Sequence, residues 1–214
     1  PGVFRRQRQM CIRDSSYGGL VFHDVIKKRH AEKAAEAGVD GLILVAAGAG
    51  GHGGTLNPMP FISEVRNFFD KTILLSGCIS NGKDVASAMQ MGADLAYMGT
   101  RFINTKESRA DEKYQQMIID SSASDIIYTA AVSGVNANFL KPSLESMGIT
   151  EEMWGEKAKM DVENEAKAWA TIWSAGQGVT TIKDCPSVKD LIETTKQEFI
   201  DSISDHAKLL EKYS

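Results

Sequence analysis

A single histidine, His52, stands inside a run of glycines, Ala49–Gly54 (AGGHGG), just after an apolar stretch. Glycine lets the backbone adopt positive φ angles and approach a ligand closely. An imidazole with an ordinary pKa near about 6.5 can exchange a proton at neutral pH. The pattern predicts a catalytic histidine on a loop whose Gly50 and Gly51 face a ligand. The competing interpretation is a glycine-rich turn with an incidental surface histidine.

Two further segments of small residues follow apolar stretches, Ser76–Gly82 (SGCISNG) and Met98–Phe102 (MGTRF). A strand that turns into a helix start exposes backbone N–H groups, and these groups bind anions with help from the helix dipole. Two such turns on consecutive units resemble the phosphate site of phosphate-binding barrels, although two ordinary turns remain the alternative. The residues predicted to contact the anion are Gly77, Cys78, Gly99 and Thr100.

Other candidates rest on weaker patterns. His23 lies near the end of an apolar run and is predicted to be a second active-site histidine, or else a hydrogen-bonded barrel residue. Ser133 follows a strand in a segment that could also be a plain turn, and Ser174 and Gln177 lie in the glycine-framed segment SAGQG. The three cysteines are too scattered for a disulfide framework or a zinc site, and no metal is expected.

Apolar runs and helix-forming segments alternate along the chain, which is typical of βαβ units and a parallel sheet. Strands are expected at 19–25, 41–46, 72–76, 95–98 and 126–132. Helices are expected at 27–37, 60–69, 83–91, 111–122, 161–173 and 186–213, the last with apolar residues at core spacing. The fold class is therefore α/β. It is interpreted as a partial (β/α)8 TIM barrel comprising about the last five βα units, followed by C-terminal helices.

Composition limits the functional classes. The chain has 214 residues, a net charge of −4 and no basic stripe, which argues against nucleic acid or an anionic membrane as the main partner. No stretch approaches the ~18 apolar residues of a membrane span. Three dispersed cysteines are typical of reduced thiols, so a cytoplasmic location is expected.

The first sixteen residues differ in character from the rest. They carry arginines without hydrophobic periodicity and without the apolar core of a secretory signal. The string RQRQMCIRDS resembles translated adaptor sequence. Residues 1–16 are therefore interpreted as a non-native segment, and residues 17–214 as the C-terminal part of a barrel domain.

From Gly18 to about Leu191 the chain resembles the nitronate monooxygenase family. The stretches that carry the resemblance are GVDGLILVAAGAGGHGG, TILLSGCISNGKDVASAMQMGADLAYMGTRF and WSAGQGV. Many family members carry Gly-Gly where this chain has Gly77-Cys78. Family barrels also begin with about three βα units that are not recognised here, which implies N-terminal truncation.

The resemblance implies an oxidoreductase of the flavoprotein monooxygenase type. Such an enzyme binds FMN and uses dioxygen to oxidise small-molecule alkyl nitronates to a carbonyl compound and nitrite. By similarity, His52 is the active-site histidine, and the turns at Gly77-Cys78 and Gly99-Thr100 hold the FMN phosphate. The resemblance also implies that Ser133 and Ser174 lie at the substrate and Gln177 at the flavin. A homodimer is left open.

Three alternatives remain at this stage. An FMN-dependent enoyl-acyl-carrier-protein reductase shares the AGGH loop and both phosphate turns, but would consume NAD(P)H and form no nitrite. A phosphosugar-binding barrel enzyme would hold no yellow chromophore. An inactive barrel fragment with no catalysis of its own would expose unpaired strand edges and apolar surface.

Overall fold

The computed structural model describes residues 18–156 and 171–213. They form two compact units. The first comprises residues up to Ala47 together with Gly54–Ser76 and Ser87–Tyr97, and the second comprises Gly48–Gly53, Gly77–Ala86 and the residues from Met98 onward. Segment 1–16 and most of the helix expected at 161–173 lie outside the described residues.

The first unit is built on a four-stranded parallel sheet. Its strands follow the chain order β1 (Phe22–Val25), β2 (Gly41–Val45), β3 (Thr72–Ser76) and β4 (Leu95–Tyr97). The central strands are short apolar runs, as expected for strands covered on both faces. These four strands confirm the expected α/β class with a parallel sheet.

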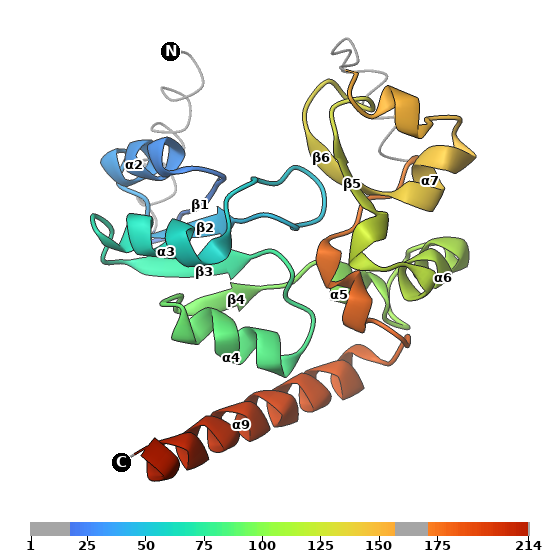
Figure 1. The fold of residues 1–214 in the computed structure, drawn as a ribbon. Coiled ribbons are helices and arrows are strands. Elements are labelled where there is room, and N and C mark those ends of the chain that lie inside the picture. The colour runs from blue at the N-terminus through green and yellow to red at the C-terminus, as the bar shows by residue number, and fades with distance from the viewer. Residues whose placement is uncertain (1–17, 157–170, 214) are drawn as a thin grey trace. The chain divides into compact units, whose positions relative to one another are not determined.

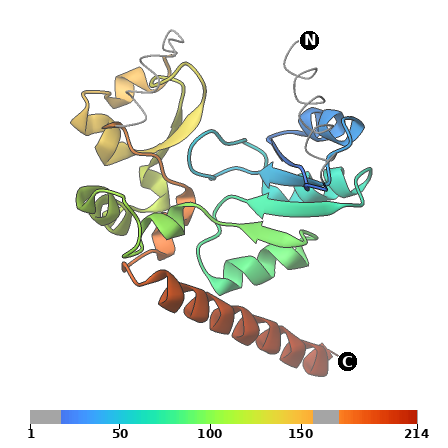
Figure 2. The ribbon, with the colours of Figure 1, turned by 180° about the vertical axis from the view of Figure 1, so that it is seen from behind.

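Helices α2 (Lys28–Glu36) and α3 (Pro58–Arg66) cover one face of this sheet (Figure 1), and Figure 2 shows the strands from the other face. The start of α3 lies two residues before the expected position. The Asn57 side chain accepts a hydrogen bond from the Met59 N–H at 3.0 Å, and Pro58 occupies the first turn. An Asn cap followed by proline is a strong helix start.

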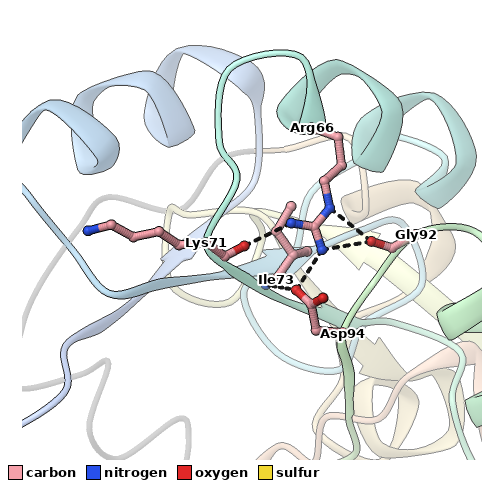
Figure 3. Close-up of polar contacts among 5 residues, drawn as sticks. All are labelled: Arg66, Lys71, Ile73, Gly92 and Asp94. Atoms are coloured by element: carbon pink, nitrogen blue, oxygen red, sulfur yellow. Dashed lines mark hydrogen bonds and ion pairs between the residues drawn. The ribbon is translucent and has the colours of Figure 1, made fainter.

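The side chain of Arg66, in the last turn of α3, joins three segments of the first unit (Figure 3). Its guanidinium donates to the carbonyls of Gly92 at 2.9 and 3.0 Å and of Lys71 at 2.8 Å. It also pairs with the Asp94 carboxylate at 2.5 Å, which accepts the Ile73 N–H at 2.7 Å. Arg66 therefore fastens α3 to the starts of β3 and β4.

Replacing Arg66 with methionine is expected to lower the free energy of unfolding by about 1–2 kcal/mol, because several hydrogen bonds are lost at a half-buried position. Although desolvation raises the pKa of Asp94, its bonds to Ile73 and Arg66 hold that pKa below the ordinary value. The stability gained at Asp94 is present above about pH 4 and is lost as pH falls through its lowered pKa. Thermal unfolding followed by circular dichroism should show the wild-type advantage at pH 7 shrinking towards pH 2–3. An equal difference at both pH values would contradict the assigned role.

The second unit is mostly helical. The boundary between the two units falls within α4 (Gly82–Gln90). The other described helices of the second unit are α5 (Thr100–Ile103), α6 (Glu112–Asp120), η1 (Ala123–Asp125), α7 (Lys141–Ser146), η2 (Glu151–Met153), η3 (Gln177–Thr181) and α9 (Val188–Tyr213). One apolar cluster gathers Ile118, Leu140, Val179 and Ile182, and another gathers Ala137, Phe139, Leu144 and Ile172.

The fifth predicted strand is not part of the parallel sheet. β5 (Ile126–Thr129) pairs antiparallel with β6 (Ala137–Leu140), a strand that the sequence analysis did not anticipate. Only residues 130–136 join the two strands. A parallel pairing needs a crossover of about a dozen residues or more, whereas an antiparallel pair needs only a short loop. The count of five parallel βα units is therefore wrong, and the described residues contain four parallel strands.

The final helix was predicted correctly. The expectation that its apolar residues are buried along the whole helix is wrong. Leu191 is buried, whereas Ile203 is 41% exposed and Leu210 is 73% exposed. Gly82 lies against the backbone of α9 at Thr195 and Phe199. Among the described residues, other parts of the chain therefore cover the apolar face of α9 only in the first half of the helix. The apolar residues in the second half of α9 are exposed.

Candidate functional site

Nearly all the predicted site residues belong to the second unit. The His52 loop, defined here as residues 48–53, has positive φ angles at Gly48 (81°) and Gly51 (71°), which favour glycine. The side chain of His52, the residue after Gly51, is exposed. The glycines thus give the loop its shape and leave the imidazole at the surface.

A second segment, called here the strap (residues 173–178), lies directly against the His52 loop. The Gln177 N–H donates to the Gly48 carbonyl at 2.8 Å. A Cβ added to Gly50 would lie 2.9 Å from the Gly176 nitrogen, and one added to Gly176 would lie 2.9 Å from the Gly50 nitrogen. The two backbones touch without intervening side chains, which only paired glycines permit.

The strap also reaches the turns predicted to bind an anion. The Gly176 N–H donates to Thr100 Oγ1 at 3.0 Å. On the other side, Cys78 Sγ lies 3.9 Å from Gln177 Oε1, and a Cβ on Gly178 would lie 3.3 Å from the Cys78 carbonyl carbon. The structure therefore brings the His52 loop and both turns together around one strap.

The turn at Gly77-Cys78 has an unusual backbone. Gly77 has φ 124° and Cys78 has φ 59°, the only positive φ of a non-glycine residue in the described part of the chain. A positive φ at a residue with a Cβ costs free energy and is retained where the surroundings impose it. Burial raises the pKa of the Cys78 thiol, and the Asp84 carboxylate adds to the rise. Cys78 is therefore a thiol at neutral pH and contributes shape rather than a nucleophile.

The start of α4 does not offer the open cradle that the sequence predicted for the whole of Ser76–Gly82. The N–H groups of Ser80 and Gly82 donate to the carboxylates of Asp84 at 2.9 Å and Glu198 at 2.8 Å, and the Asp84 N–H donates to Asn81 Oδ1 at 2.9 Å. Carboxylates of the chain itself stabilise this helix terminus, as its dipole favours. The anion-binding part of the prediction is thereby restricted to the turn before Ser80.

The turn at Gly99-Thr100 is more open. Gly99 precedes α5 without a capping side chain, and no atom lies within 4 Å of the position a Cβ would take there. The next residue, Arg101, is 6% exposed and pairs with Asp184 at 2.6 Å. Arg101 thus fixes the segment after the strap to α5 and leaves the backbone at Gly99 accessible.

The sequence profile of the nitronate monooxygenase family matches residues 3–198. The chain belongs to this family. The nitronate monooxygenase of Paraburkholderia phytofirmans is 30% identical over 129 residues, which are 56% of this chain and 35% of that protein. A putative monooxygenase of Mycobacterium tuberculosis is 23% identical over 215 residues, covering 89% of this chain and 57% of that protein. The chain therefore spans between about a third and somewhat more than half of the length of these relatives.

Solved structures share the fold of this member of the nitronate monooxygenase family. FabK from Thermotoga maritima has a TM-score of 0.79 at 24% identity, covering 97% of this chain and 68% of that one. Nitroalkane oxidase from Streptomyces ansochromogenes has a TM-score of 0.78 at 24% identity, covering 92% of this chain and 62% of that one. At this identity the likeness establishes the fold alone.

The remaining three predicted residues have different surroundings. His23 is the second residue of β1 and belongs to the first unit. Ser133 is buried in the β5–β6 connection, where its hydroxyl donates to the Val135 carbonyl at 3.2 Å. Ser174 belongs to the strap, but its recorded contact is a carbonyl that accepts from Tyr114. The catalytic role expected for His23 and the substrate roles expected for Ser133 and Ser174 remain predictions.

Within residues 18–156 and 171–213, no three His, Cys, Asp or Glu side chains gather as a metal site. Over the same part of the chain, no helix combines the length and apolar character that crossing a bilayer would require.

Tyr114 contacts the strap at Trp173 and Ser174. The Tyr114 hydroxyl donates to the Ser174 carbonyl, and its ring stacks on Trp173 with centroids 5.0 Å apart. Burial raises the pKa of Tyr114 to about 12. The stability gained by keeping this phenol neutral is fully present below about pH 10 and is lost as pH rises towards 12.

Replacing Tyr114 with phenylalanine is expected to remove about 2–3 kcal/mol of this alkaline dependence, because the shift of about two pKa units no longer exists. Urea unfolding between pH 9 and pH 12, followed by tryptophan fluorescence, measures it. Tyr213, which is 80% exposed, is the matched control. Equal alkaline losses in wild type and Tyr114→Phe would show that this phenol does not govern the dependence.

Proposed function

We propose that the protein of which this chain is part oxidises alkyl nitronates with dioxygen to a carbonyl compound and nitrite, using FMN. The observation that supports the proposal is the convergence of the His52 loop and the turns at Gly77-Cys78 and Gly99-Thr100 on one strap. Family membership supports the same chemistry. The four parallel strands would then belong to a (β/α)8 barrel.

The residues around the strap fit an FMN phosphate. Gly99 has open space beside its backbone, and the Ser80 hydroxyl oxygen is buried beside Gly178 without a hydrogen-bond partner. Backbone amides at Gly77-Cys78 and Gly99-Thr100 would hold the phosphate. Gly50, Gly51 and Gln177 would lie along the rest of the cofactor.

Each side chain then has a limited task. Bound FMN would supply the redox chemistry, taking electrons from the substrate and passing them to dioxygen. His52 would donate a hydrogen bond to the nitro oxygens of a nitronate, or remove the α-proton of the parent nitroalkane. Thr100 would position the strap through Gly176. His23 remains proposed as a second catalytic histidine.

The test is made on the purified 214-residue chain. FMN is titrated into it, and a nitronate is then supplied while dioxygen uptake and nitrite release are followed. Nitrite formation coupled to dioxygen uptake supports the proposal. NAD(P)H oxidation with an enoyl thioester and no nitrite would favour a reductase, and absence of both activities together with absence of FMN binding would favour an inactive fragment.

Apolar side chains on the edge strands of the sheet are exposed, and this observation favours the alternative of an inactive barrel fragment. On the edge strands β1 and β4, Phe22 is 36% exposed, Leu95 is 52% exposed and Tyr97 is 50% exposed. Apolar side chains on strand edges promote self-association. Sedimentation of the same preparation therefore accompanies the activity assay, since aggregation with loss of FMN would count against the proposed function of this chain.

A further inference from the structure

The β5–β6 hairpin donates hydrogen bonds to alternate carbonyls of the His52 loop. The Asn138 side-chain amide donates to the Ala49 carbonyl at 2.6 Å, and the Asn138 main-chain N–H donates to the Gly51 carbonyl at 2.8 Å. The Tyr128 hydroxyl donates to the Gly53 carbonyl at 3.1 Å. Three successive odd-numbered carbonyls are therefore bound by two residues.

These two donors sit opposite each other in the hairpin. Tyr128 of β5 and Asn138 of β6 are direct cross-strand partners, and Gly51 forms an isolated antiparallel bridge with Asn138. Side chains directly opposite each other on two antiparallel strands contact and stabilise one another. The hairpin therefore supports the backbone of the His52 loop through hydrogen bonds at three of its carbonyls.

Strand β6 and the His52 loop differ in burial and in glycine content. The residues beside Asn138 in β6, Ala137 and Phe139, are fully buried, and Asn138 itself is only 3% exposed. The loop, by contrast, contains four glycines among its six residues (GAGGHG), and glycine backbones retain many conformations unless something outside fixes them. The order of the His52 loop thus comes from its neighbours rather than from its own sequence.

The opposite side of the loop is also occupied. While residues 49, 51 and 53 meet the hairpin, Gly50 faces the backbone of the strap at Gly176. His52 lies between two carbonyls that the hairpin holds, those of Gly51 and Gly53. A displacement of either carbonyl changes the direction in which the imidazole leaves the backbone.

We propose that Asn138 is a positioning residue that acts through His52 by fixing the backbone on the N-terminal side of the imidazole, with Tyr128 fixing the other side. The catalytic part of this inference rests on the proposed function. A carbonyl partner requires Asn138 to present its NH2 group, so aspartate, which has nearly the same shape but no N–H, removes the interaction specifically.

The first measurement needs neither FMN nor substrate. The imidazole resonance of His52 is identified in a proton–carbon NMR spectrum by its absence in His52→Ala. It is expected to shift or broaden in Asn138→Asp and, by less, in Tyr128→Phe, while the His206 resonance stays in place. Asn136→Asp, on an exposed position of the same hairpin connection, adds the same charge and is expected to leave the His52 resonance unchanged.

The second measurement is a double-mutant cycle on nitronate turnover per bound flavin. Asn138→Asp is expected to lower kcat about tenfold with KM changed less than about twofold, because losing one buried hydrogen bond to a positioned group has an effect of this order. In the His52→Ala background the same substitution is expected to change kcat less than twofold. A residue that only stabilised the fold would lower the melting temperature and leave kcat per flavin unaltered.

An unchanged His52 resonance in both Asn138→Asp and Tyr128→Phe would overturn the inference, as would an equal loss of kcat with and without His52. If Asn138→Asp does not fold, Tyr128→Phe carries the same test, because Tyr128 is 38% exposed and loses only a hydroxyl. A wild-type chain that binds FMN but turns over no nitronate would count against the proposed function, whereas the resonance measurement would still decide the role of Asn138.

Discussion

Replacing His52 with alanine is expected to lower nitronate turnover by about 10²–10⁴-fold, the usual contribution of a positioned acid–base group. FMN affinity is expected to change less than about twofold, because the proposed phosphate contacts come from the turns at Gly77-Cys78 and Gly99-Thr100. The imidazole of His52 is exposed and contributes little to folding. The free energy of unfolding should therefore change by no more than about 0.5 kcal/mol, as is usual for a surface substitution. Stopped-flow reduction of the flavin and steady-state nitrite release measure the effect.

The matched control is His206→Ala. His206 lies on α9, and its ring contacts only the Ser202 carbonyl among the recorded hydrogen bonds, at 2.7 Å. Its replacement should leave turnover unchanged. If His52→Ala and His206→Ala have the same kcat, His52 has no part in the reaction, and His23 becomes the histidine to examine.

The sequence identified the parts of the site that depend on local backbone chemistry. Glycines around His52 permit a backbone with positive φ, and the structure places such angles at Gly48 and Gly51. The turns at Gly77-Cys78 and Gly99-Thr100 were predicted because a strand that turns into a helix start exposes backbone N–H groups. The grouping of these segments around residues 173–178 agrees with the weaker expectation at Gln177.

The parts that sequence reasoning missed depend on partners far away in the chain. Glu198 bonds the Gly82 N–H across 116 positions, and nothing near Gly82 signals that contact. The strand that contains Asn138 was not anticipated, because it is only four residues long and fully buried and so shows no alternation of apolar and polar residues. A short connection between two apolar runs, 130–136, was the available signal for an antiparallel pair.

Gly50→Ala is the substitution expected to damage the site most without altering any side chain that does chemistry. The added Cβ would lie 2.9 Å from the Gly176 nitrogen, 3.0 Å from the Ala175 carbonyl carbon and 3.2 Å from Thr100 Oγ1. Two of these atoms are backbone atoms of the strap, so relief requires the strap or the His52 loop to move. Overpacking of this kind costs about 1–3 kcal/mol, and FMN affinity is expected to fall at least about tenfold.

Two measurements check this expectation on the same samples. Urea unfolding followed by tryptophan fluorescence reports on the second unit through Trp154 and Trp173, which belong to it, and FMN titration reports on the site. Gly155→Ala is the matched control, since no atom lies within 4 Å of its added Cβ. It should change neither quantity. A Gly50→Ala chain that binds FMN as tightly as wild type and unfolds at the same urea concentration would mean that the loop and the strap do not touch as described, and the proposed cofactor site would lose its main structural support.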